Sequence, residues 1–426
     1  GVAEMRIAVV GSGIAGLSAA WLLARDHQVT LFEAEERLGG HTHTVDMHLE
    51  GHSFPVDTGF LVFNHRTYPE LTGLFHQLGV ETVASDMSFS VKLESPALEW
   101  SGTSLNTVFG QRANLARPDF WRMLRDILRF NREAPADAAV HDAMALGDYL
   151  RSRGYGKPFI QWYLLPMAAA IWSCPTARML EFPLASFVTF CRNHGLLQIL
   201  DRPQWRTVAG GGREYVCKLA AGIGEIHVGQ PVEAVRPRGG RIEVSSGHLS
   251  GLYDQVVLAC HSDQASRLLG QHYPDRSRLL GLIPYQENRA LLHTDASLLP
   301  ARKALWSAWN YQSTGSGLES TPVAVNYLIN QLQPLPVTTP VIVSLNPVQE
   351  PDPARVHGEY HYSHPVFTRQ ARQAQLGLKL RNGRDGLWLA GAWLGYGFHE
   401  DGLVSALNLV RRMQVAEPRR EQTVAA

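Results

Sequence analysis

Glycines near the start of the sequence have the spacing needed to bind a phosphate group. Gly11, Gly13 and Gly16 form a GxGxxG pattern directly after the β-branched run 7–10. The first glycine permits a tight turn, the second lets a pyrophosphate approach the backbone, and the third allows close packing of a helix on a strand. Glu33 follows 22 residues after Gly11, where a carboxylate can accept hydrogen bonds from two ribose hydroxyls. The pattern predicts a dinucleotide whose pyrophosphate lies at a helix N-terminus, held by Gly11, Ser12, Gly13, Ile14, Ala15 and Gly16.

A second loop follows the adenosine-binding carboxylate. Arg37 precedes the pair Gly39 and Gly40, which lets this loop close over the same pyrophosphate. FAD lies extended and needs protein on more sides than NAD does, so the pattern favours FAD. We assign to this FAD site, in addition, Ala34, His41, Thr58, Gly59, Phe60, Val232 and Ala259.

Histidines and cysteines do not form a metal-binding pattern. His41, His43, His48 and His52 lie close in sequence, but no cysteine or carboxylate joins them at ligand spacing. We therefore predict no metal, and a covalent flavin link through His41 stays an alternative. The segment 172–175 offers a serine and a cysteine, but no base is placed to activate them. We interpret it as a helix end in the wall of a substrate pocket, lined by Phe63, Asn64, Tyr68, Trp172 and Trp205.

The composition indicates an ordinary globular protein. The chain has 426 residues, 45% hydrophobic and 18% charged, which suits two interleaved domains. The 39 basic and 39 acidic residues balance, so nothing suggests nucleic-acid binding. Four scattered cysteines indicate reduced thiols in a cytoplasmic protein. No signal peptide is recognised, and the apolar run 159–172 is too short to span a bilayer. We expect a soluble protein with at most a peripheral membrane contact.

Periodicity predicts the elements that position these residues. A strand at 7–10, a helix at 17–24 and a strand at 29–32 frame the glycine turn. Alternation predicts a hairpin at 41–56 with its turn at Glu50 and Gly51, and helical spacing predicts a helix at 68–78 that ends at Gly79. Further expected elements are strands within 85–110, helices over 118–191 with Phe120, Trp121, Leu124, Ile127 and Leu128 on one face, a helix at 213–221, strands near 226–228, 232–235, 242–244 and 255–259, a sheet within 291–343, a strand at 386–391, a loop at 395–402 and a helix at 403–412.

The expected fold class is α/β. A Rossmann-type, glutathione-reductase-like FAD domain is predicted from the separated pieces 1–60, 206–270 and 368–415. An interleaved α+β substrate domain takes 61–205, which contains a helical insertion, and 271–367. Residues 416–426 form a polar tail that we expect to be disordered.

The order of these motifs resembles the flavin-dependent amine oxidase and phytoene desaturase superfamily. The shared features are the GxGxxG turn, Glu33, the RxGG loop, the glycine-rich turn before a mid-chain helix, and a late strand that ends in Ala-Gly. A more specific resemblance is to a bacterial flavoprotein family related to the N-terminal oxidase-like domain of plant cyclopropane fatty acid synthases. The stretches that carry it are DTGFLVFNHRTYPEL (57–71), SDMSFSV (85–91), PMAAAIWSCP (166–175), FCRNHGLLQ (190–198), RPQWRTVAGG (202–211) and GYGFHEDGL (395–403).

The superfamily resemblance implies roles near the end of the chain. The junction at 399–403 is expected to aim a helix N-terminus at the pyrimidine edge of the flavin, where positive potential favours reduction. The superfamily usually has an acid after the Ala-Gly pair, but here Gly391 is followed by Ala392, so Glu400 and Asp401 become candidates for the ribityl contact. Gly391, Ala392, Glu400, Asp401, Gly402 and Leu403 complete the expected FAD site. The alternative for Asp401 is a simple helix cap.

The same resemblance implies the candidate catalytic residues. Tyr396 and Phe398 fall where amine oxidases place an aromatic wall, and His399 is the titratable group best placed for proton transfer. The expected reaction is hydride removal from an apolar, long-chain unsaturated or modified acyl lipid. One alternative is amine oxidation. Another is an FAD-binding accessory subunit of a lipid methyltransferase, with no turnover of its own.

Overall fold

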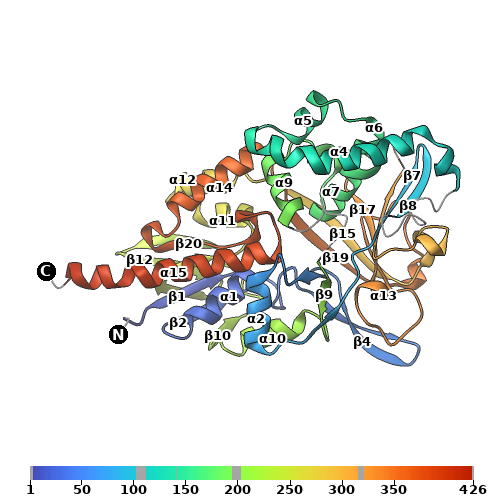
Figure 1. The fold of residues 1–426 in the computed structure, drawn as a ribbon. Coiled ribbons are helices and arrows are strands. Elements are labelled where there is room, and N and C mark those ends of the chain that lie inside the picture. The colour runs from blue at the N-terminus through green and yellow to red at the C-terminus, as the bar shows by residue number, and fades with distance from the viewer. Residues whose placement is uncertain (1–2, 102–111, 142, 194–202, 315–320, 425–426) are drawn as a thin grey trace.

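The computed structural model describes residues 3–101, 112–141, 143–193, 203–314 and 321–424. Figure 1 shows two regions side by side, a parallel sheet with its helices near the N-terminus and a larger sheet covered by a layer of helices. The FAD-binding α/β fold expected from the sequence is confirmed. Among the described residues, no helix is long and apolar enough to cross a membrane.

A parallel sheet carries the glycine turn. Within the described residues its five strands run in the order β10, β2, β1, β14 and β20. They come from distant parts of the chain, with bounds β1 Arg6–Val10, β2 Gln28–Phe32, β10 Glu225–His227, β14 Gln255–Leu258 and β20 Leu387–Leu389. The inner strands read as almost continuous apolar runs because helices or strands cover both faces of the sheet.

Alternate residues of β1 point to opposite faces of this sheet. Ile7 and Val9 pack with helices on one side, whereas Ala8 and Val10 pack with a β-meander and helices on the other. The first side holds α1 Ile14–Leu23, α2 Pro69–Leu78, α10 Arg213–Ala220 and α15 His399–Val424. The second side holds β11 Ala234–Arg238, β12 Arg241–Ser246, β13 Leu249–Tyr253, α11 Ser262–Leu269, α12 Pro274–Leu280 and α14 Arg369–Arg381.

A mixed sheet forms the second region. In the described part of the chain seven strands have the order β19, β15, β18, β17, β16, β7 and β8, and only the β16–β7 pair is parallel. Their bounds are β7 Phe89–Glu94, β8 Ala97–Ser101, β15 Tyr285–His293, β16 Trp309–Ser313, β17 Ala324–Leu328, β18 Ile342–Leu345 and β19 Val356–Pro365. Shorter pairings join β3 Thr44–Leu49 to β4 His52–Asp57, and β9 Trp205–Val208 to β5 Phe63–Asn64 and β6 Thr82–Ala84.

A helical layer packs on the mixed sheet and shares its apolar core. It consists of α4 Pro118–Val140, α5 Leu146–Ser152, α6 Lys157–Phe159, the π-helix η2 Ile160–Leu164, α7 Leu165–Trp172, α8 Thr176–Met179 and α9 Leu184–Asn193. Short helices elsewhere are η1 Arg112–Ala116, η3 Gly270–His272, η4 Ala296–Leu298, η5 Lys303–Leu305, α13 Ile329–Leu332, η6 Pro353–Arg355, η7 Arg384–Gly386 and η8 Ala392–Leu394.

The elements nearest the N-terminus agree with the sequence prediction. The strand–helix–strand unit is present, although α1 begins at Ile14 rather than at residue 17. The hairpin turns at Glu50 and Gly51, both with positive φ, and α2 ends at Gly79 in the left-handed conformation.

Two expectations are corrected by the structure. Phe120 of α4 is buried as expected, but Trp121 and Leu128 are exposed, and Met123 and Phe130 complete the buried face. The strand expected at 232–235 begins at Ala234. Of the range 85–110, the part 102–110 lies outside the described residues.

The last helix differs from the expectation at both ends. It begins at His399 rather than 403, because the Asp401 carboxylate accepts from the backbone N–H of Phe398 and closes the first turn. It continues to Val424, through residues predicted to be a disordered tail.

Candidate functional site

A cavity of about 890 Å³ opens where the parallel strands end. Val10, Phe32 and Ala259 line it at or just after the carboxyl ends of β1, β2 and β14. Ligands of open α/β sheets bind at this edge. The cavity extends from there to the mixed sheet and the helical layer, which makes it large enough for a cofactor together with a substrate.

The glycine turn leaves space for a phosphate. Gly11 has φ +105° and its N–H donates to the carbonyl of Phe32 at 2.8 Å. A Cβ on Gly16 would lie 1.8 Å from the carbonyl oxygen of Gly11, whereas a Cβ on Gly13 would meet no atom within 4 Å. Helix α1 has no side-chain cap and no acid in its first turn, so its N-terminal N–H groups and positive end face the cavity uncompensated.

Glu33 is held in place by the same turn. Its Oε1 accepts from the backbone N–H of Ser12 at 3.1 Å and from the Ser12 hydroxyl, and its Oε2 accepts from the N–H of Glu35 at 2.9 Å. The carboxylate lines the cavity beside the glycine turn. This position suits the recognition of ribose hydroxyls.

The loop after Glu33 packs on the glycine turn. The Arg37 guanidinium donates to the carbonyls of Gly40 at 2.8 Å and Thr42 at 3.2 Å, which folds the loop back on itself. The N–H of Gly39 donates to the carbonyl of Ser12 at 3.0 Å, and a Cβ on Gly40 would lie 2.9 Å from the Cα of Gly13. Only a residue without a side chain permits this approach, so two loops enclose the space above α1.

A third segment, at residues 58–60, joins the cavity wall. The N–H of Phe60 donates to the carbonyl of His41 at 2.8 Å, and a Cβ on Gly59 would lie 1.9 Å from that oxygen. The ring of Phe60 stacks on the imidazole of His399, with 3.8 Å between centroids. The segment therefore connects the glycine-rich loop to the start of α15.

His399 is partly buried in a network of neutral partners. Its Nε2 lies 3.0 Å from the Thr42 hydroxyl and 2.7 Å from the Tyr215 hydroxyl, and those two hydroxyls also contact each other. Burial lowers the pKa of His399 to about 3, with a smaller contribution from nearby His41. The imidazole is therefore neutral at physiological pH and acts as a hydrogen-bonding group.

Three further histidines surround one part of the cavity. The ring of His41 lies 5.0 Å from that of His364 and 5.9 Å from that of His261. His41 Nε2 donates to the carbonyl of Ser363 at 3.2 Å, and His364 Nδ1 accepts from Asn288 at 2.8 Å, which fixes both tautomers. Burial lowers the pKa of His41 to about 4. Within the described residues, no group of three His, Cys, Asp or Glu side chains could hold a metal ion.

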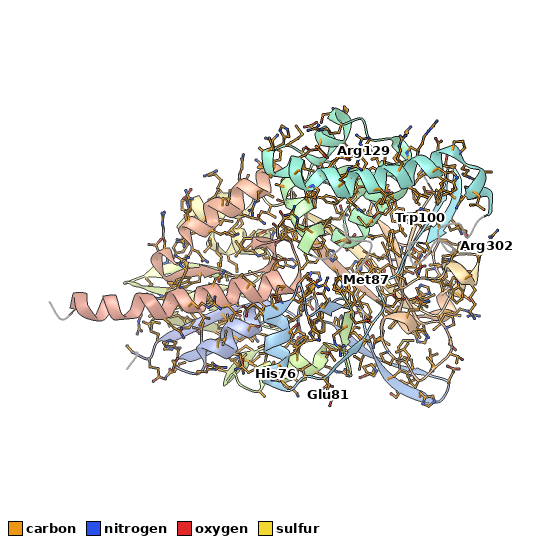
Figure 2. The ribbon with its side chains drawn as sticks, in the orientation of Figure 1. His76, Glu81, Met87, Trp100, Arg129 and Arg302 are labelled. Atoms are coloured by element: carbon orange, nitrogen blue, oxygen red, sulfur yellow. The ribbon has the colours of Figure 1, made fainter. Side chains whose placement is uncertain are left out.

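The far end of the cavity is apolar. It is bounded by side chains from α7, α9, β9 and the mixed sheet, and by Met87 of the loop before β7, which Figure 2 places near the centre of the molecule. The charged lining residues Glu33, Glu35, Arg37, Glu233 and Arg267 all lie at the dinucleotide end. The apolar end is lined by Leu61, Val62, Tyr68, Met87, Ala170, Ile171, Ser173, Phe190, Trp205, Trp309, Tyr327, Val343 and Leu345.

The comparisons with known proteins agree with this site. The family model described as flavin containing amine oxidoreductase matches residues 14–414. The chain belongs to this family. It therefore binds FAD and is an oxidoreductase of the amine oxidase-like superfamily, as the sequence predicts.

The proteins that resemble this chain have names that refer to different compounds. A carotenoid phi-ring synthase of Streptomyces griseus is 28% identical over 322 residues, covering 70% of this chain and 59% of that protein. A putative protoporphyrinogen oxidase from Exiguobacterium has the same fold, with a TM-score of 0.69, 17% identity and coverage of 98% and 100% of the two chains. A fatty acid isomerase from P. acnes that produces CLA has a TM-score of 0.68, 13% identity and coverage of 96% and 98%.

Most residues that the sequence assigned to the FAD site line the cavity. They are Gly11, Ser12, Gly13, Ile14, Ala15, Glu33, Ala34, Arg37, Gly40, His41, Thr58, Gly59, Phe60, Val232, Ala259, Gly391 and Ala392. Gly16 and Gly39 do not line it and instead shape the two loops. Phe398 and His399 line it among the candidate catalytic residues, and Tyr68 and Trp205 among the candidate pocket residues.

Four residues near the end of the chain that were expected to contact FAD do not line the cavity. Glu400 accepts from the N–H groups of Leu71 at 2.8 Å and Glu70 at 3.0 Å, so it caps α2. Asp401 caps its own helix, which was the alternative reading. Leu403 is buried against α1, and a Cβ on Gly402 would lie 2.8 Å from Ile14, so both serve helix packing.

Four other candidates lie behind the cavity wall. Phe63 is fully buried in the core below the parallel sheet, and Asn64 accepts from Thr67 in a turn. Trp172 donates to the carbonyl of Tyr396 at 3.0 Å, and neither side chain lines the cavity. Trp172 instead packs against Phe398, 5.8 Å between centroids, and supports it from behind.

Several lining residues lie within the stretches that carry the family resemblance, although they were not expected at the site. Met87 lies in SDMSFSV, Ile171 and Ser173 lie in PMAAAIWSCP, and Phe190 is the first residue of FCRNHGLLQ. The family stretches were thus a usable signal, but they do not show which face of α7 meets the cavity. No local sequence pattern predicts His261, His364 or Tyr215 at the site, because each is brought there by contacts with residues far away in the sequence.

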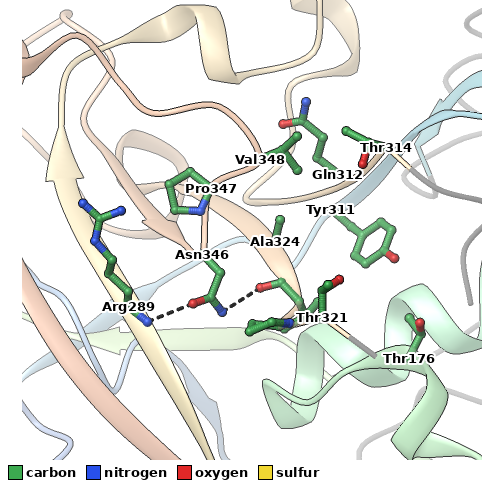
Figure 3. Close-up of a pocket in the computed structure, with 12 residues that line it drawn as sticks. Thr176, Arg289, Tyr311, Gln312, Thr314, Thr321, Ala324, Asn346, Pro347 and Val348 are labelled. Atoms are coloured by element: carbon green, nitrogen blue, oxygen red, sulfur yellow. Dashed lines mark hydrogen bonds between the residues drawn. The ribbon is translucent and has the colours of Figure 1, made fainter. Parts of the chain in front are cut away.

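A second cavity of about 320 Å³ lies at one end of the mixed sheet (Figure 3). Asn346 accepts from the N–H of Arg289 at 2.9 Å and donates to the carbonyl of Val323 at 2.9 Å. The charge of Arg289 is compensated by Glu350 and Glu359. Nothing in this smaller cavity adds to the flavin chemistry.

Proposed function

We propose that this FAD-dependent oxidoreductase removes a hydride, and with it a proton from the neighbouring carbon, from an apolar, long-chain unsaturated or modified acyl lipid, and so makes a new double bond while the flavin is reduced. The observation that supports the proposal most is the composition of the apolar end of the cavity: no described residue that lines it carries a charge. A cationic amine would bury its charge there without a counter-ion, which costs several kcal/mol unless the charge is neutralised. A hydrocarbon chain has no such cost and gains from burial.

The residues present fit FAD. The open space at Gly13 and the uncapped start of α1 would hold the pyrophosphate, and Glu33 the adenosine ribose. Segments 58–60 and 397–399 would hold the flavin ring, and the N-terminus of α15 adds positive potential there. When bound, FAD supplies a hydride acceptor.

The chain's own residues exclude water and orient the substrate in this proposal. Phe398 stacks on Phe190 with 4.4 Å between centroids, and Phe60 stacks on His399, so rigid apolar rings form the wall beside the cofactor segments. His399 stays neutral and holds Thr42 and Tyr215 rather than carrying a charge. We place the cofactor domain at 1–60, 206–270 and 368–415, and the substrate domain at 61–205 and 271–367, from which α2 and α12 pack on the sheet of the cofactor domain.

The names of two similar proteins are compatible with this substrate class. One is a carotenoid phi-ring synthase and another is a fatty acid isomerase, so apolar chains are handled by proteins that share this fold. The family description itself favours a second candidate, amine oxidation. The aromatic pair Phe398 and Phe190 could form the wall that such a reaction needs.

The test is anaerobic reduction of the bound flavin, followed as bleaching of its visible absorbance. We expect bleaching with a monounsaturated fatty acid or phospholipid and none with a primary amine or polyamine. Ile171→Asp places a carboxylate in the apolar end, so the rate with lipid should fall at least roughly 10-fold, while Ile171→Leu keeps it. Bleaching by the amine alone would replace the proposal with amine oxidation. No bleaching by any lipid or amine, together with tight binding to a lipid methyltransferase, would favour the accessory-subunit alternative.

A further inference from the structure

The outward face of α4 exposes large apolar side chains. Trp121 is 49% exposed and Leu128 is 54% exposed, and Leu115, just before the helix, is 52% exposed. The opposite face is buried through Phe120, Met123 and Phe130. The helix is therefore fixed by its inner face, and it lies on the outside of the helical layer (Figure 1) with these apolar side chains exposed.

Arginines interrupt this stripe at helical spacing. Trp121, Arg125, Leu128 and Arg132 follow one another at intervals of four, three and four residues, which places them on one side of the helix. All four are exposed. We call these four residues the α4 stripe.

The surroundings of the α4 stripe are basic. Residues 115–133 contain five arginines, two aspartates and one glutamate, although the whole chain is neutral, and Glu133 pairs with Arg132 at 3.7 Å. Of the two aspartates, Asp126 is buried, where it accepts from the N–H of Gly156. Asp119 pairs with Arg122 at 2.9 Å. Arg129, labelled in Figure 2, turns away to pair with Asp126 and lies over the ring of Tyr155.

The layer that carries α4 also forms the apolar end of the cavity. Helix α4 packs on α9, and Phe190 of α9 and Ile171 of α7 line the cavity. A surface contact at α4 would therefore bring the apolar end of the cavity close to the surface that α4 contacts. This step rests on the proposed function.

We propose that the α4 stripe docks the protein on the surface of a lipid bilayer that contains anionic headgroups. Tryptophan and leucine side chains insert at the boundary between headgroups and acyl chains, and arginines beside them are attracted by anionic lipid. A bilayer fits better than a protein partner because the feature is one straight helical stripe with alternating apolar and basic residues rather than a concave or centred patch. Docking would deliver an acyl substrate without its passage through water.

The test uses the FAD-loaded full chain and sedimentation with vesicles. We expect binding to vesicles of phosphatidylcholine with phosphatidylglycerol, weaker binding to phosphatidylcholine alone, and loss of binding at high salt. Trp121→Ser with Leu128→Ser should weaken binding at least roughly 30-fold. Arg125→Gln with Arg132→Gln should weaken it roughly 10-fold or more, and only on the anionic vesicles.

A matched control comes from α14. Leu376 and Leu380 are 51% and 76% exposed there, and Leu376→Ser with Leu380→Ser should leave vesicle binding unchanged. Retained flavin absorbance shows that each variant is folded. No vesicle binding by the unaltered protein, or equal binding by the stripe variants, overturns the proposal. A dimer that is lost in the Trp121→Ser, Leu128→Ser variant also overturns it and makes the face an interface between copies.

The two proposals fail separately. Flavin bleaching by a detergent-dispersed lipid measures the reaction without a bilayer, and the stripe variants should keep that rate. Bleaching without vesicle binding refutes the docking surface alone. Vesicle binding without bleaching by any lipid refutes the lipid substrate alone.

Discussion

The imidazole of His399 lies parallel to the ring of Phe60, with planes 9° apart and centroids separated by 3.8 Å. The two residues are more than 300 positions apart in sequence, and each lines the cavity. The stack holds the start of α15 against the loop that follows β4. Both residues of the stack belong to the segments proposed to hold the flavin ring. Substitution of either residue should therefore weaken the binding of FAD.

His399→Asn tests whether this histidine acts by position or by titration. The variant loses the ring stack and part of the contact with Thr42 and Tyr215, so we expect FAD to bind roughly 10-fold more weakly. Since the pKa of His399 is lowered to about 3, its charge does not change between pH 5.5 and 8.5. The pH profile of flavin reduction should therefore keep its shape in the variant. Loss of a limb near neutral pH would show that His399 transfers a proton.

A pair of glycine substitutions separates cofactor binding from folding. Gly13→Ala adds a methyl group where the chain itself leaves open space, so the variant should fold normally but retain at least roughly 10-fold less FAD. Gly16→Ala adds a methyl group 1.8 Å from the carbonyl oxygen of Gly11, so it should destabilise the fold by several kcal/mol. Flavin content and urea unfolding distinguish the two. Normal FAD retention in Gly13→Ala would place the pyrophosphate elsewhere.

Glu400→Ala should lower stability without changing the cofactor. Its carboxylate caps α2 through the N–H groups of Glu70 and Leu71, and loss of such a cap costs about 1–2 kcal/mol. Urea unfolding measures this loss, and the flavin spectrum should be unaltered because Glu400 does not line the cavity. Glu70→Gln is the control, because it leaves the Glu400 carboxylate and the backbone N–H groups that it accepts from in place. A shifted flavin spectrum in Glu400→Ala would instead support the contact with the ribityl chain that the sequence predicts for Glu400.

Asp57 should make stability depend on pH. It accepts from the hydroxyl of Thr44 at 2.7 Å and the N–H of Gly212 at 3.0 Å, but burial raises its pKa from 3.8 to about 6. The folded state therefore binds a proton more tightly than the unfolded state does, and this contribution is present at low pH and lost as pH rises through about 6. Relative to Asp57→Asn, the free energy of unfolding should fall by about 2 kcal/mol between pH 4 and pH 7.5.

Urea titrations of the unaltered protein and Asp57→Asn at several pH values give that difference directly. Other acids in the chain titrate in both proteins and cancel in the comparison. A difference that is constant between pH 4 and pH 7.5 would show that the buried carboxylate keeps its ordinary pKa.

The sequence could predict the cofactor end of the site because that information is local. The turn at Gly11, the helix behind it and Glu33 lie within one strand–helix–strand unit. The steric reasons that predict a glycine at each position of the turn are found in the structure. The second loop at Arg37 follows within a few residues. The fold class and the cofactor could therefore be predicted from short-range patterns in the sequence.

The rest of the site depends on contacts that short-range pattern does not encode. Glu400 and Asp401 stand in the first turn of a helix, where a carboxylate can cap its own helix, cap another or bind a ligand. Which of these occurs depends on α2, some 330 residues earlier. Likewise Trp172 and Ile171 are neighbours on α7, and only the packing of that helix decides that Ile171 lines the cavity and Trp172 supports its wall.

The order of the parallel strands also restricts when the protein can acquire its cofactor during synthesis. The centre strand β1 emerges first from the ribosome, but its neighbour β14 and the edge strand β20 emerge only after residues 255 and 387. Until then the glycine turn has no wall from Gly391, Phe398 or His399. We therefore expect flavin capture to be a late event on the nascent chain, and ribosomes stalled before residue 387 should carry a polypeptide that does not retain FAD.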